Sequence, residues 1–83
     1  MIQKQVSYVL DAFFKDNIQV KHKIFVHQVN KTIHIFHYNH ELIRFDIDTK
    51  HVYGVMGKEY RCQTDTRILN SIIEYLKLYN HIT

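Results

Sequence analysis

The 83-residue chain contains no proline, no tryptophan, two glycines and one cysteine. The lone cysteine, Cys62, excludes an internal disulfide framework, so we expect a protein of a reducing, cytoplasmic compartment. Gly54 and Gly57 cannot supply the glycine-rich loop that cradles phosphates in nucleotide-binding proteins. These scarcities exclude the disulfide-stabilised secreted proteins and the nucleotide-binding enzymes that depend on such a loop.

Long hydrophobic runs are missing as well. No apolar segment approaches the roughly 20 residues that a membrane-spanning helix needs, and the first residues lack the apolar stretch of a signal peptide. Hydrophobic residues nevertheless make up 46% of the chain. That content can form a core and offset the entropy of ordering the chain. We therefore expect residues 1–83 to form a single compact domain with no membrane partner.

Acidic residues are absent from a long central segment. The formal net charge is +3, and residues 17–40 contain three lysines and five histidines but no Asp or Glu. This asymmetry makes the first half of the chain the leading candidate for a binding surface. The abundance of Ile, Lys, Asn and Tyr is typical of AT-rich coding sequences such as those of phages and mobile elements.

Hydrophobic periodicity divides the chain into six elements. Apolar residues at helical spacing predict a helix over residues 2–15, with Asn17 as its C-terminal cap. A second helical stripe predicts a helix that is capped by Thr64 or Asp65 and ends near Asn80. Between the helices, alternation with a period of two predicts strands over residues 18–27, 32–38, 42–47 and 51–56.

The connections between these strands are short and rich in turn-forming residues, which favours antiparallel neighbours. Two amphipathic helices and a sheet with one apolar face must cover one another. The sequence therefore predicts an α+β fold of order α-β-β-β-β-α, an antiparallel meander sheet with both helices packed on one face. The other face of the sheet is left open.

The turn at Asn30-Lys31 sets the register of the first two strands. A two-residue turn there pairs Phe25 with Phe36 and His27 with His34. Residues on the opposite face of these strands are aliphatic and suit the core beneath the helices.

The second connection sets the register of the third strand. If Asn39-His40-Glu41 is a three-residue connection, Arg44 lies beside Phe36 and Asp46 beside His34. The open face then presents cations together with aromatic rings. Its predicted partner-binding residues are Lys21, Lys23, Phe25, His27, His34, Phe36, Tyr38 and Arg44.

Three interpretations of this face remain open. Exposed aromatic residues rimmed by charge are typical of protein interfaces. Lysines and stacking rings also suit single-stranded nucleic acid, because cations neutralise phosphates while rings stack on bases. In the third interpretation, Phe25 and Phe36 are simply a cross-strand pair that stabilises a solvated sheet.

His34, His37 and His40 are evenly spaced, three residues apart. On a strand, this spacing sends His34 and His37 to opposite faces and leaves His40 in a turn. Across strands, His27, His34 and Asp46 would form a row of metal-ligand type, but such a row lacks the enclosure that metal sites need. We expect no metal and no cofactor, and we expect His37 to be a hydrogen-bonded histidine at the core edge, opposite Ile24.

The remaining sequence gives little sign of catalysis, because Cys62 has no histidine near it in the sequence and no serine lies in a nucleophile motif. The apolar stripe of the last helix is wider than one covered face requires. It fits either a helix wedged between the sheet and the first helix, or the seam of a homodimer. We therefore expect a small binding protein rather than an enzyme. Its expected role is that of a phage or mobile-element regulator or inhibitor that docks on a host or cognate protein, with nucleic-acid binding as the alternative.

Overall fold

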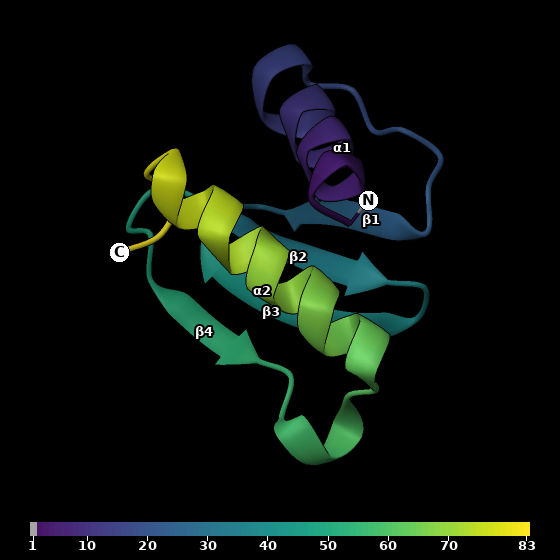
Figure 1. The fold of residues 1–83 in the computed structure, drawn as a ribbon. Coiled ribbons are helices and arrows are strands. Elements are labelled where there is room, and N and C mark those ends of the chain that lie inside the picture. Colours follow the sequence, from purple (N-terminus) through teal and green to yellow (C-terminus); the bar gives the residue numbers. More distant parts are fainter. Residues whose placement is uncertain (1) are drawn as a thin grey trace.

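The computed structural model describes residues 2–83 and has the α+β architecture expected from the sequence. Along the chain, one helix precedes and one helix follows four antiparallel strands. Both helices lie on the same side of the sheet (Figure 1). The strands are ordered β1-β2-β3-β4, so β1 and β4 form the two edges. The elements are α1 (Ile2–Asp16), β1 (Ile24–Val29), β2 (Thr32–His37), β3 (His40–Asp46), β4 (Val52–Val55), the short 3₁₀ helix η1 (Lys58–Tyr60) and α2 (Gln63–Leu78).

The core lies between the helices and one face of the sheet. Helix α1 packs on β1 and on α2, and α2 packs on β3. The apolar residues expected on the inner face of the first three strands are buried there, including Ile24, Ile35 and Phe45. The broad stripe of α2 faces both the sheet and α1, and the Tyr75 hydroxyl donates a hydrogen bond of 2.5 Å to Asp11 of α1. This double contact accounts for the width of the stripe.

The predicted register of β1 and β2 is confirmed. Phe25 lies opposite Phe36 and His27 opposite His34, as a two-residue turn at Asn30-Lys31 requires. The left-handed conformation of Asn30, with φ of 54°, suits an asparagine in such a turn. The open face therefore begins with the aromatic pair that the sequence predicted.

The predicted start of the first strand is wrong. Residues 17–23 form a connection, and β1 begins at Ile24. In the observed register, residues 18–22 would have to pair with residues 39–43, which belong to the next turn and to β3. Without a partner strand these residues form no ladder. Lys21 consequently lies off the sheet, whereas Lys23 reaches it through a hydrogen bond from Tyr38 N to Lys23 O.

The predicted register of the third strand is also wrong. The chain turns at Tyr38-Asn39, with His37 opposite His40, instead of using a three-residue connection. A bulge then shifts the register between Ile35 and Phe36, and this extra residue restores the inward direction of the aliphatic side chains. As a result, Arg44 lies opposite His34 rather than Phe36.

The N-terminal cap of α2 is Cys62, not Thr64 or Asp65. The Asp65 amide donates to the Cys62 sulfur, and the Asp65 carboxylate accepts from the Cys62 amide in a reciprocal capping box. At the C-terminal end of α1, Asn17 adopts φ of 54°, as expected for its cap position. No helix within residues 2–83 is both long enough and apolar enough to cross a membrane.

Candidate functional site

The open face of the sheet is the candidate site that the sequence predicts. Most of the predicted residues lie on or beside this face in the structure. Side chains from β1, β2 and β3 line this face, and Tyr38 and Lys23 lie at the end near the second hairpin turn. Lys21 is outside the sheet. The residues on or bordering the face are Lys23, Phe25, His27, His34, Phe36, Tyr38 and Arg44.

The half of the face formed by β1 and β2 is aromatic. We call Phe25, His27, Phe36 and Tyr38 the aromatic patch. The ring centroids of Phe25 and Phe36 are 6.0 Å apart, and those of Phe25 and His27 are 6.1 Å apart. These side chains, together with Asn39, line a mainly apolar hollow of about 370 Å³. The patch is thus a shallow concave surface rather than a flat one.

Tyr38 has an unfavourable backbone conformation for its residue type. It is 67% exposed and has φ of 53° in the turn between β2 and β3. Among the described residues, the non-glycine residues with positive φ are Tyr38, Lys50 and three asparagines. Asparagine tolerates this conformation, whereas a tyrosine there costs roughly 1 kcal/mol. The backbone at Tyr38 is therefore strained while most of its side chain is exposed.

Positive charge borders the aromatic patch without local compensation. Lys21 and Lys23 are exposed, and no carboxylate of the described residues lies within ion-pair distance of either lysine. The segment from residue 17 to residue 40 contains no acid that could provide one. The patch therefore combines an apolar hollow with one free cation, Lys23, at its end.

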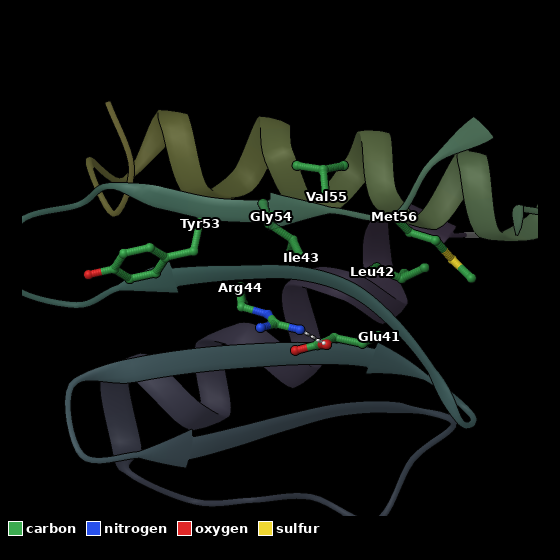
Figure 2. Close-up of a pocket in the computed structure, with 8 residues that line it drawn as sticks. All are labelled: Glu41, Leu42, Ile43, Arg44, Tyr53, Gly54, Val55 and Met56. Atoms are coloured by element: carbon green, nitrogen blue, oxygen red, sulfur yellow. Dashed lines mark hydrogen bonds and ion pairs between the residues drawn. The ribbon is translucent and has the colours of Figure 1, made fainter. Parts of the chain in front are cut away.

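The half of the face formed by β2 and β3 is polar and balanced in charge. Glu41 binds His34 through one carboxylate oxygen and Arg44 through the other, at 2.7 Å from Arg44 Nη2. Figure 2 shows the Arg44 and Glu41 side chains directed toward each other. Burial raises the pKa of Glu41, but the hydrogen bonds from His34 and Arg44 outweigh burial. The pKa of Glu41 is therefore below its usual value. Arg44 is therefore engaged within the protein.

The row of His27, His34 and Asp46 does not form. Asp46 lies opposite Thr32, and its Oδ1 accepts hydrogen bonds from the Asp48 and Thr49 amides in the following turn. Within residues 2–83, no group of three His, Cys, Asp or Glu side chains is placed to hold a metal ion.

Sequence reasoning missed a cluster at the second hairpin turn. His37, which is buried opposite Ile24 as predicted, lies with its Nδ1 2.6 Å from Oδ1 of Asp65. His40 Nδ1 lies 2.9 Å from Oδ2 of the same carboxylate. His37 and His40 are cross-strand partners, so the tight turn places two evenly spaced histidines on one carboxylate. The three-residue spacing of His37 and His40 fits two residues that pair across a two-residue turn. The predicted three-residue connection placed His40 in the turn, so this pairing was not predicted.

Comparisons with protein-family models, curated proteins and solved structures return no significant match.

Proposed function

We propose that this protein is a non-catalytic binding protein that docks on another protein through the aromatic patch. The observation that carries this proposal is the exposed, strained Tyr38 beside the hollow formed with Phe25 and Phe36. Such an apolar hollow accepts an apolar or aromatic side chain of a partner. Because Lys23 borders the patch without a carboxylate partner, the matching surface carries an acidic residue beside that side chain.

The charges on the face favour a protein partner over nucleic acid. A nucleic-acid surface needs cations along the whole path of the phosphate backbone. Here Arg44 is bound to Glu41, and the adjoining carboxylate of Asp46 adds negative charge to that half of the sheet. The cation of the face without a carboxylate partner is Lys23, at the end of the aromatic patch. That arrangement suits a localised acidic contact better than an extended strand.

The proposed mode of action is occupancy: the protein covers a surface of its partner and thereby regulates or inhibits it. The composition bias of the sequence supports a phage or mobile-element origin, in which such a partner is a host protein. The last helix supports no second docking surface of equal quality, because its apolar stripe is largely used between the sheet and α1.

The test compares partner capture by the wild-type protein with capture by the double variant Phe25→Ala/Tyr38→Asn. Asparagine at position 38 suits the positive φ, and Phe25 is 37% exposed, so the variant should fold. The matched control is Tyr8→Ala, which removes an exposed ring from α1, the helix that packs on the covered face of the sheet. Bound proteins are quantified by mass spectrometry at low and moderate salt.

The proposal expects one partner that is retained by the wild type and by Tyr8→Ala and is reduced about tenfold or more with the double variant. Equal recovery with all three proteins would reject the aromatic patch as the docking surface. A fluorescent single-stranded oligonucleotide serves as the alternative probe. Tight binding of that probe, with affinity that falls steeply as salt is added, would replace the protein-docking proposal by nucleic-acid binding.

A further inference from the structure

A groove runs between the two helices on the outer side of the helix layer. Two hollows of about 370 Å³ and 200 Å³ adjoin there, and Gln3, Ser71 and Glu74 line both of them. Every lining residue belongs to α1 or α2, apart from Tyr79, the C-terminal cap of α2. Both helices lie on one side of the sheet (Figure 1). The groove is therefore separate from the open face and from the aromatic patch.

The middle of the groove has small side chains on both walls. Ser7 comes from α1 and Ser71 from α2, and the exposed Asn70 lies beside Ser71. The distance between two packed helices depends on the size of the side chains at their contact, and small ones permit an approach of about 8 Å. A further helix can therefore come close to α2 at Asn70 and Ser71.

Two opposite charges lie on either side of this point. Arg67 and Glu74 are both exposed, and both line the larger hollow. They are seven residues apart, which is close to two helical turns, so they share one face of α2 and lie about 10 Å apart along its axis. No described residue lies within ion-pair distance of either side chain. The groove thus presents one free cation and one free anion at a set spacing.

This charge pattern is complementary to itself. Arg67 lies three residues before Asn70, and Glu74 lies three residues after Ser71. A two-fold axis that passes between Asn70 and Ser71 places a second α2 antiparallel to the first, with Arg67 of each protomer beside Glu74 of the other. Such an isologous contact uses the same patch twice, so both ion pairs form together. A parallel arrangement would place like charges side by side, which is unfavourable.

We propose that the chain forms an antiparallel homodimer through the outer side of α2, with two reciprocal ion pairs between Arg67 and Glu74. The contact is centred on Asn70 and Ser71. It does not involve the buried apolar stripe of α2, which packs on the sheet and on α1. The inference goes beyond the proposed function, because it concerns a different surface and a different partner, a second copy of the chain.

The size of the contact predicts a weak dimer. The molecule measures only 29 × 24 × 22 Å, and α2 has 16 residues. A seam along one pair of such helices is smaller than the roughly 1,600 Å² of a standard protein interface. Exposed ion pairs also contribute little each. We therefore expect a reversible dimer with a dissociation constant between about 10 µM and 1 mM.

The dimer would present two docking surfaces. The seam lies on the helix side of each protomer, so the open face of each sheet, with its aromatic patch, stays accessible. A partner that displays two copies of its docking site could then be bound at both patches. Binding at two linked sites raises the apparent affinity without any new contact.

The test measures dimerisation of the 83-residue chain by sedimentation velocity, at protein concentrations from about 10 µM to about 1 mM. The variants are Arg67→Glu, Glu74→Arg and the double exchange Arg67→Glu/Glu74→Arg. The matched control is Lys58→Glu, which makes the same change of charge at an exposed position in η1, outside the groove. All of these positions are exposed, so the variants should fold, and circular dichroism checks this.

The proposal expects Lys58→Glu to dimerise with the dissociation constant of the wild type. Each single reversal, Arg67→Glu or Glu74→Arg, should weaken dimerisation about tenfold or more, because like charges then face each other twice. The double exchange should restore the wild-type constant within about threefold. An equimolar mixture of the two single variants should form heterodimers, because one carries two anions at the seam and the other two cations.

A wild type that stays monomeric at about 1 mM would overturn the proposal and favour a helix of another protein as the occupant of the groove. A dimer that neither single reversal weakens would overturn it as well. Loss of the dimer in Phe25→Ala/Tyr38→Asn would place the contact on the open face instead. Salt gives a test that needs no variant: raising sodium chloride from about 50 mM to about 500 mM should weaken the wild-type dimer about tenfold, and no change would contradict the ion pairs.

Discussion

His37 donates a hydrogen bond of 2.6 Å to Asp65, a residue that is completely buried and 28 positions later in the chain. His40 donates to the second oxygen of the same carboxylate at 2.9 Å. Asp65 also completes the capping box of α2 with Cys62. A single carboxylate therefore joins the turn between β2 and β3 to the start of α2, and it fixes the hairpin that carries Tyr38.

Replacing Asp65 with alanine is expected to destabilise the protein by about 3 kcal/mol. The substitution removes the cap and leaves the buried His37 without its acceptor. Chemical denaturation monitored by circular dichroism gives the free energy of unfolding. The control is Asp48→Ala, which breaks only the exposed pair with Lys31 and should change stability by less than about 1 kcal/mol. Similar losses for both variants would contradict the role assigned to the cluster.

Acid should weaken the fold through Asp65. Burial raises the pKa of this carboxyl, but hydrogen bonds from His37, His40 and Cys62 outweigh it and bring the pKa to about 2, below its usual 3.8. The carboxylate therefore stabilises the native state fully above pH 3.8, and this contribution is lost as the pH falls toward 2. Across that pH range, the free energy of unfolding of the wild type should fall by about 2 kcal/mol more than that of Asp65→Asn. Parallel stability curves for the two proteins would reject this assignment.

The contact between the helices offers a second stability test. The Tyr75 hydroxyl donates to Asp11, and burial together with this hydrogen bond raises the pKa of the phenol. Tyr75→Phe keeps the ring in the core and removes only the hydrogen bond. It should lower the free energy of unfolding by about 1 to 2 kcal/mol. Tyr60→Phe, which alters an exposed tyrosine of η1, should leave stability unchanged within about 0.5 kcal/mol.

Tyr38→Asn is expected to make the protein more stable. Asparagine suits the φ of 53° at this position, as it does at Asn30 in the other hairpin turn. The gain should be about 0.5 to 1 kcal/mol in the free energy of unfolding, measured by thermal and denaturant unfolding. A loss of stability would mean that the contact between the Tyr38 and His37 rings, whose centroids are 4.7 Å apart, matters more to the fold than the strain.

The element order and the register of the first hairpin could be predicted because local signals agree there. Alternation in β1 and β2 and the turn residue Asn30 all point to the same pairing of Phe25 with Phe36. The second hairpin could not be predicted in the same way. Its turn begins with Tyr38, a residue that does not signal positive φ, and the bulge that corrects its register has no mark in the sequence.

The candidate site was predicted in part for the same reason. Phe25, Phe36 and His27 follow from the first hairpin and lie on the open face. Lys21 was misplaced because alternation continues through residues 18–22, although no partner strand is left for them. The link from His37 to Asp65 joins elements far apart in the sequence, and periodicity carries no information about such a contact.

The most direct test of the account is a parallel measurement of stability and partner binding for Tyr38→Asn. If Tyr38 serves docking at a cost in stability, Tyr38→Asn should be more stable than the wild type and should capture about tenfold less partner. Tyr8→Ala should bind as much partner as the wild type does. Capture of the partner at the wild-type level by Tyr38→Asn and by Phe25→Ala/Tyr38→Asn would contradict the central claim that the aromatic patch is the docking surface.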